Sequence, residues 1–271
     1  MAIQITRRWA LGGIAAMAAL LAGGSIVCAA GPDAAAPLEL RVLFLGNSQI
    51  YFNELPRMVE ALSESAPPDR PRIKAGQYVA GGASLQSLWE AGTDEGKPQA
   101  LIASQPWDVV IVQEIYTYYS KPETFEKYAT LFEGLIRRHN ARPVLYCTAS
   151  INDLYPEGFH KLHEMQMALG KKLNVPVCAA GQSWLEYWGE SPSLEQRLDL
   201  YHTDKAHPGV KGSYLNACAL YAQLTGTSPV GLTHRMPKQP ADAIPADQAR
   251  QMQEAAWSVY QEINEQVEER P

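Results

Sequence analysis

The sequence predicts an α/β fold in which a five-stranded parallel sheet carries helices on both faces. Short apolar runs alternate along the chain with longer segments whose apolar residues recur at helical spacing, and this alternation is typical of a parallel sheet. The runs are continuously apolar, as expected for strands that are buried on both faces. With 271 residues, 46% of them apolar, the chain suits one domain of ordinary core size rather than two.

The expected strands and helices follow one another in the order that such a sheet requires. The five expected strands are Val42 to Leu45, Ile73 to Val79, Val109 to Val112, Val144 to Cys147 and Val175 to Ala179. Helical spacing between them covers Leu55 to Leu62, Phe125 to Arg138 and Phe159 to Leu173. Two further helices are expected at Gly209 to Leu224 and over an apolar stripe from Ala249 to Val267.

The first thirty residues differ in kind from the rest of the chain. Arg7 and Arg8 precede an uncharged run rich in Ala, Gly, Leu and Ile, which ends in the small residues Cys28-Ala29-Ala30. This layout is that of a secretory signal peptide, so we expect residues 1–30 to be removed and the protein to be periplasmic or secreted. The arginine pair also resembles a twin-arginine signal. An uncleaved membrane anchor is the alternative, since the apolar run nearly reaches spanning length.

The remaining chain divides by composition into three parts. Residues 31–37 form an Ala/Pro-rich lead that we expect to be mobile, and 38–235 form the main domain. Residues 236–271 comprise a Pro-rich connector and the terminal helix. The apolar stripe of that helix is expected to pack on the main domain, with a dimer contact as the alternative use.

Charge and cysteine content exclude several classes of protein. Removing Arg7 and Arg8 from 23 basic residues leaves 21 against 29 acidic ones, so the mature surface should repel nucleic acid and anionic lipid. Cleavage also removes Cys28 and leaves Cys147, Cys178 and Cys218, which we interpret as small buried hydrophobes. No C-x-x-C pair and no H-E-x-x-H motif is present, and we expect neither a metal nor a cofactor.

Three polar residues from opposite ends of the chain form a candidate nucleophilic site. Ser48 follows the first apolar run, and Asp204 and His207 lie three residues apart in Y-H-T-D-K-A-H-P-G. A serine hydroxyl needs a base to take its proton, and that base needs a carboxylate to fix its tautomer. Each residue alone is more often an ordinary turn or loop residue. Together they predict that Ser48 is a nucleophile, His207 its base and Asp204 the partner of His207.

These residues carry a resemblance to the SGNH (GDSL-like) hydrolases. Leu45-Gly46-Asn47-Ser48 resembles the first block of that family, and Asp204-Lys205-Ala206-His207-Pro208 resembles the last. Val79-Ala80-Gly81-Gly82-Ala83-Ser84 is similar to the second block, which implies that the Gly82 N–H, with that of Ser48, forms an oxyanion hole. The resemblance extends from about Arg41 to Leu232. It implies a three-layer, flavodoxin-like SGNH fold and a serine hydrolase.

The third block of the family departs from the usual pattern. Where G-x-N-D is usual, this chain has Gln113-Glu114-Ile115-Tyr116, as in a bacterial GNS-type branch of unassigned function. We expect Gln113 to replace the usual asparagine and to donate its amide to the oxyanion. The alternative is that Gln113 and Glu114 only hold neighbouring loops.

Aromatic residues just past the strand ends are candidates for substrate binding. Tyr51, Tyr116 and Tyr118 are expected to stack on a sugar or to line an acyl pocket. With export, they favour a serine esterase that removes an O-acetyl group from a carbohydrate through an acyl-enzyme. The alternatives are a lipase or thioesterase of the same family, and a non-catalytic carbohydrate-binding protein. The expected partner is a small-molecule or glycan ester, with no nucleic acid and, once the signal is removed, no membrane.

Overall fold

Five parallel strands form one sheet in the order β2-β1-β3-β4-β5. The computed structural model describes residues 39–117 and 121–268; the expected signal peptide and the lead at 31–37 lie outside these ranges. The strands are β1 (Glu39–Gly46), β2 (Arg72–Val79), β3 (Val109–Val112), β4 (Arg142–Tyr146) and β5 (Val177–Cys178). This is the strand order of flavodoxin-like folds, so the predicted α/β fold with a five-stranded parallel sheet is confirmed.

Alternate residues of the strands enter two separate apolar cores, one on each face of the sheet. Val42 and Phe44 of β1 belong to one core, and Leu43 and Leu45 belong to the other. Because successive side chains of a strand point to opposite faces, both faces must be covered to bury them. This explains why the strands are continuously apolar in sequence.

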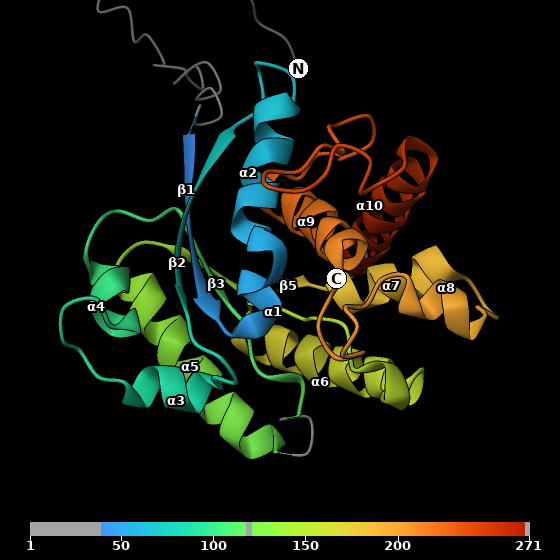
Figure 1. Ribbon diagram of the computed structural model, residues 1–271. Helices are drawn as coiled ribbons and strands as arrows, with labels where there is room; N and C mark the ends of the chain where they lie inside the picture. The colour runs from blue at the N-terminus through green and yellow to red at the C-terminus, as the bar shows by residue number, and fades with distance from the viewer. Residues whose placement is uncertain (1–38, 118–120, 269–271) are drawn as a thin grey trace, which may run out of the picture. The chain divides into compact units, whose positions relative to one another are not determined.

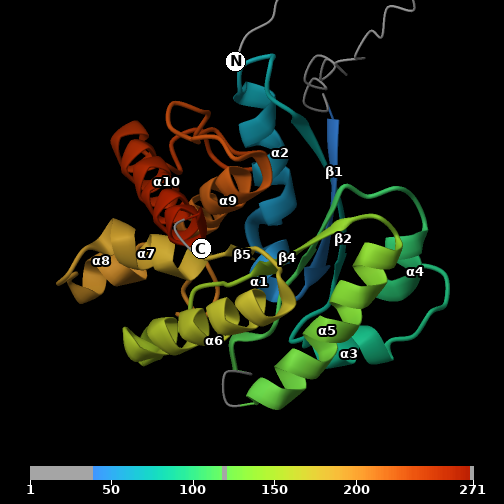
Figure 2. The same cartoon turned by 180° about the vertical axis from the view of Figure 1, so that it is seen from behind.

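Helices cover both faces, as Figures 1 and 2 show from opposite sides. Helices α2 (Leu55–Ser65), α7 (Ala180–Trp188), α9 (Val210–Thr225) and α10 (Ala246–Glu268) pack with one another over the first core. Over the second core lie α3 (Leu85–Glu90), α4 (Pro98–Ala103), α5 (Pro122–Arg138) and α6 (Glu157–Leu173). Two short helices, α1 (Ser48–Tyr51) and α8 (Leu194–Leu198), and the 3₁₀ turns η1 (Phe52–Glu54) and η3 (Asn152–Leu154) lie in connections.

The terminal helix α10 packs against α7 and α9. Its buried residues Ala249, Met252 and Ala256 recur at helical spacing and are at most 1% exposed. From Ala249 to Ala256, the stripe read from the sequence is therefore a packing surface within the chain. No helix among the described residues is long and apolar enough to span a membrane.

The three cysteines of the described chain are free and buried. Cys147, Cys178 and Cys218 are each at most 2% exposed. Burial raises the pKa of the Cys147 thiol to about 12, so it stays protonated and unreactive at neutral pH. The interpretation of these residues as buried hydrophobes is confirmed.

Candidate active site

Ser48 lies at the carboxyl end of β1, where the chain turns from the sheet into α1. β1 ends at Gly46, Asn47 caps α1, and Ser48 is its first residue. A Cβ atom on Gly46 would stand 2.5 Å from Oε1 of Gln113, so a larger residue there would displace the Gln113 side chain. Asn47 Oδ1 accepts a hydrogen bond from the Gln49 N–H at 3.0 Å. The turn is thus held on both sides of the serine.

The strand order reverses between β1 and β3, and ligands of open α/β sheets bind at such a point.

Asp204 and His207 lie on a tight loop closed by a bridge between Tyr201 and Pro208. The His202 N–H donates to the His207 carbonyl at 2.8 Å across this loop. Lys205 adopts φ of 60°, in the left-handed region, and so reverses the chain between the two site residues. The resulting fold of the loop brings the carboxylate of Asp204 to Nδ1 of His207.

The three predicted residues form one hydrogen-bonded chain. His207 Nε2 lies 2.8 Å from Ser48 Oγ, and His207 Nδ1 lies 2.7 Å from Asp204 Oδ2. An ionised carboxylate only accepts hydrogen bonds, so Nδ1 carries the proton in the neutral ring. Nε2 is then free to accept from the serine hydroxyl. This is the geometry of a serine nucleophile and its base.

Asp204 is held in its ionised form. Burial acts to raise the pKa of its carboxyl, but hydrogen bonds from the His207 and Ala206 N–H groups, both 2.9 Å long, and the His207 ring together lower that pKa below its ordinary value. The carboxylate therefore remains charged wherever His207 would work as a base.

The turn that holds Gly82 lies beside the serine turn. The Ala80 N–H donates to the Gly46 carbonyl at 3.1 Å, and the Asn47 side chain donates to the Ala83 carbonyl at 2.8 Å. Gly82 has φ of 66°, which a glycine adopts without strain. Within the part of the chain that the structure describes, the N–H groups of Ser48 and Gly82 donate to no acceptor.

Gln113 lies at this site, and its side chain is bonded to the main chain. Its side chain is fully buried, and Oε1 accepts the Asn47 N–H at 2.9 Å. Its amide nitrogen donates one of its two hydrogens to the Glu114 carbonyl, and the role of Gln113 as an oxyanion donor stays a prediction that depends on the other hydrogen. Asn47 follows β1 and Glu114 follows β3, so Gln113 joins these two strand ends.

Glu114 is a buried carboxylate whose contacts are main-chain N–H groups. It is 3% exposed and accepts from the Ile115 N–H at 2.7 Å and from the Leu85 N–H at 3.2 Å. Burial raises the pKa of Glu114 to about 7, although these two hydrogen bonds oppose the shift. Glu114 therefore ties the end of β3 to the start of α3, just beyond the Gly82 turn.

Three further residues contact the predicted base, its carboxylate partner or its loop, and the sequence analysis predicted none of these contacts. Phe52 stacks on His207 with ring centroids 4.0 Å apart and an interplanar angle of 5°. Asn53 Nδ2 donates to the Pro208 carbonyl at 3.0 Å. His202 Nδ1 lies 3.3 Å from the same Asp204 oxygen that His207 uses. The position of Phe52 and Asn53 four and five residues after Ser48 was the available signal.

The three aromatic candidates differ in placement. Tyr51 is 40% exposed and lines a cavity of about 340 Å³ beside β2. Tyr116 is partly buried and packs against the second core, so it has a structural role. Tyr118 lies outside the described residues.

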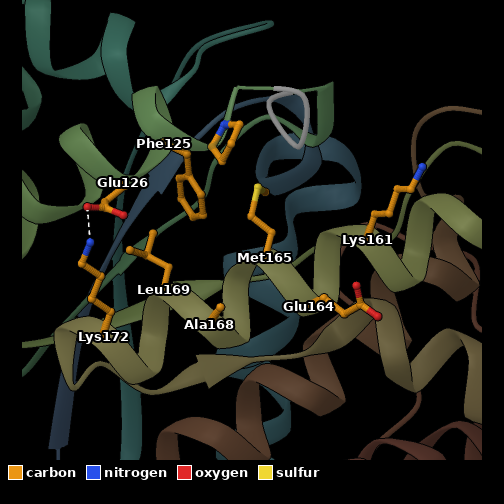
Figure 3. Close-up of a pocket in the computed structure, with 9 residues that line it drawn as sticks. Phe125, Glu126, Lys161, Glu164, Met165, Ala168, Leu169 and Lys172 are labelled. Atoms are coloured by element: carbon orange, nitrogen blue, oxygen red, sulfur yellow. Dashed lines mark hydrogen bonds and ion pairs between the residues drawn. The ribbon is translucent and has the colours of Figure 1, made fainter.

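A larger groove of about 520 Å³ lies between α5 and α6 and is separate from this site (Figure 3). Phe125, Met165 and Leu169 form its apolar floor, and the ion pair between Glu126 and Lys172 closes one end. None of the described site residues lines it. The groove therefore contributes nothing to the candidate active site.

Comparison with known proteins relates the fold to the SGNH hydrolases. No family model and no curated protein matches the sequence. A provisionally assigned SGNH hydrolase from Slackia heliotrinireducens matches with TM-score 0.56 and 22% identity, covering 68% of this chain and 98% of that one. A DUF4886 family protein from Bacteroides uniformis matches with TM-score 0.65 and 16% identity, covering 82% and 94%.

A third similar structure is a variant of an acetyl-xylooligosaccharide esterase from Geobacillus. It has TM-score 0.55 and 14% identity, and the match covers 70% of this chain and 96% of that one. At these identities the likeness establishes the fold alone. The chain thus has the three-layer α/β fold of SGNH hydrolases, as the sequence motifs implied.

Proposed function

We propose that this protein is a serine esterase that works through an acyl-enzyme. The observation that carries the proposal is the continuous hydrogen-bonded chain from Ser48 Oγ through His207 to Asp204, with lengths of 2.8 and 2.7 Å. These residues come from opposite ends of the sequence, and nothing in the packing of the core requires their polar atoms to meet. A nucleophile, a base and an orienting carboxylate are what ester cleavage needs.

In the proposed reaction, the Ser48 hydroxyl attacks the ester carbonyl while His207 Nε2 takes its proton. The resulting imidazolium is stabilised by ionised Asp204. It then returns the proton to the leaving alcohol, and the acyl group stays on Ser48. Water activated by the same His207 nitrogen releases the acid and restores the serine.

The main-chain N–H groups of Ser48 and Gly82 are the proposed donors to the oxyanion. Both are unused within the described residues, and two hydrogen bonds hold the Gly82 turn against the serine turn. Donors that are fixed before the reaction stabilise transition-state charge without reorganising. In this proposal Gln113 positions the oxyanion hole indirectly. Its side chain accepts the N–H of Asn47, the residue that precedes Ser48 in the sequence.

We propose an O-acetyl group on a carbohydrate as the substrate of the exported enzyme. Tyr51, three residues after Ser48, offers an exposed ring for stacking on a sugar. The cavity beside it is lined mainly by polar and charged side chains: Glu54, Arg57, Gln77 and Lys238, with Pro56 and Ala75. Such a surface suits a hydroxyl-rich ligand better than a long acyl chain. The similar Geobacillus structure, an acetyl-xylooligosaccharide esterase, supports the same substrate class.

Labelling of the serine tests the activity. The mature protein is incubated with a fluorophosphonate probe and with p-nitrophenyl acetate, beside Ser48→Ala as the matched control. We expect probe on Ser48 and release of nitrophenol, and neither in the control. Acetylated xylooligosaccharides and p-nitrophenyl esters of increasing chain length then separate a carbohydrate esterase from a lipase or thioesterase. A wild-type protein that binds the glycan but takes no label would be the non-catalytic binding protein instead.

A further inference from the structure

The ring of Phe52 lies face to face with the ring of His207. Their centroids are 4.0 Å apart, and their planes differ by 5°. The ring nitrogens of His207 are bonded in its own plane to Ser48 and Asp204, so Phe52 occupies one of the two faces that remain. Phe52 thus covers one face of the ring of the proposed base.

The backbone around Phe52 is held in an uncommon conformation. Asn53 and Glu54, the next two residues, both have positive φ, 53° and 56°. Non-glycine residues adopt this region only when their surroundings fix them. Asn53 Nδ2 donates to the Pro208 carbonyl at 3.0 Å and to Ser213 Oγ at 2.9 Å, and so attaches this turn to the histidine loop.

The stacked contact acts differently on the two charge states of His207. The face of a phenyl ring carries negative electrostatic potential, so it attracts a cation. A neutral imidazole gains much less from a parallel arrangement, since neutral aromatic pairs prefer offset or edge-to-face contacts. During the proposed reaction His207 becomes an imidazolium in the transition state. A contact that is stronger in that state than in the ground state accelerates the reaction.

We propose that Phe52 is a positioning residue that fixes the plane of His207 and stabilises its imidazolium, an inference that rests on the proposed function. Asn53 is the anchor that keeps Phe52 in place. Within the described residues, the titratable groups around this pair are Asp204 at Nδ1, His202 at the edge of Phe52 with centroids 5.5 Å apart, and Tyr51, whose ring lies 5.6 Å from that of Phe52.

The test compares two variants. Phe52→Leu removes the aromatic ring, and Phe52→Trp replaces it with a ring that attracts a cation more strongly. The dependence of kcat and kcat/KM for p-nitrophenyl acetate on pH is measured for each. We expect Phe52→Leu to lower kcat about 2- to 30-fold and to move the acid limb of kcat/KM to lower pH, because the cationic form of the base has lost a stabilising contact. Phe52→Trp should keep kcat near wild type and leave the acid limb at or above its wild-type position.

Phe132→Leu is the matched control, since Phe132 is a fully buried ring on α5 that contacts Trp89 and not the site. It should lower stability without moving the acid limb. An acid limb that stays at its wild-type pH in Phe52→Leu, or a Phe52→Trp variant as impaired as the leucine variant, would overturn the proposal.

A second measurement separates this inference from the proposed function. Titration of the His207 ring is followed by NMR in Ser48→Ala protein with Phe, Leu or Trp at position 52. A His207→Asn sample identifies its signal among those of the six histidines. We expect the midpoint to fall with leucine and to be kept or raised with tryptophan. This result needs no turnover, so it stands even if wild-type protein cleaves no ester. Equal midpoints in all three proteins would refute the role of Phe52.

Discussion

Two carboxylates near the serine turn show how surroundings alone assign different states to one chemical group. Hydrogen bonds from two N–H groups and the His207 ring lower the pKa of Asp204 against the effect of burial. Burial dominates at Glu114 and raises its pKa to about 7. The charged carboxylate is the one that contacts the proposed base. The carboxyl group of Glu114 instead contacts the main chain at Leu85 and Ile115.

Replacing members of the proposed triad should abolish turnover. We expect Ser48→Ala and His207→Ala each to lower kcat by about 10⁴-fold or more, because residues that act as a unit fail together. Asp204→Asn should cost less than either, since serine and histidine remain in contact. Steady-state kinetics with an acetyl ester measure all three. Retention of a tenth of wild-type activity by Ser48→Ala would show that another group is the nucleophile.

Replacing Gln113 distinguishes a structural role for its side chain from a role as an oxyanion donor. Its side chain binds the Asn47 N–H and the Glu114 carbonyl, so Gln113→Ala leaves a buried donor without a partner. We expect a loss of about 1–3 kcal/mol in the free energy of unfolding and a fall in kcat of less than about tenfold. Urea denaturation and kcat are measured on the same samples. A fall in kcat of about 10²- to 10³-fold with unchanged stability would instead identify Gln113 as an oxyanion donor.

The sequence predicted that Ser48, Asp204 and His207 lie together but not which side chains contact them, for a physical reason. Ser48, Asp204 and His207 stand in motifs whose spacing can be read locally. Phe52 and His207 are 155 positions apart, and no periodicity links them. The main-chain hydrogen bonds of the Gln113 side chain were equally hidden, because they depend on which main-chain groups at the ends of β1 and β3 lack a partner.

At the scale of elements, hydrophobic pattern located the long segments and missed the short ones. β3 matches its predicted range, and α2, α5, α6, α9 and α10 lie where helical spacing placed them. The helices α1, α3, α4, α7 and α8 have four to nine residues. One or two turns are too short for a period of 3.6 to be distinguished, so caps and tertiary contacts decide such helices.

Glu114 joins β3 to α3, and the stability of this junction should depend on pH. Its pKa is about 7 in the folded protein against 4.5 as the ordinary value. Between these values the folded protein holds a proton that the unfolded chain has lost, so the free energy of unfolding falls as pH rises through this window. The full effect is about 3 kcal/mol, with stability greatest below pH 4.5 for this group.

Glu114→Gln tests this assignment, because glutamine keeps acceptor oxygen without a charge. Urea denaturation at intervals from pH 4.5 to pH 8 should show wild-type protein losing stability relative to the variant as pH rises. A constant difference across the whole range would mean that Glu114 ionises with an ordinary pKa in the folded state.

For the whole molecule, the buried thiols give a test of packing that is independent of function. Cys147, Cys178 and Cys218 are at most 2% exposed, and burial raises the pKa of each. We expect thiol reagent to label almost none of them in native mature protein and all three after denaturation without reductant. Finding only one thiol in the denatured sample would reveal a disulfide between two of them.

Export is the prediction that concerns the part of the sequence outside the described residues. Arg7 and Arg8, the uncharged run and the small residues at Cys28-Ala29-Ala30 lead us to expect cleavage near Ala29 or Ala30. Intact mass of protein recovered from the periplasm or medium measures this. Replacing both arginines with glutamine should block export if the twin-arginine route is used. A mass that retains residues 1–30 in a membrane fraction would establish the anchor, and would confine the proposed esterase to substrates at the membrane surface.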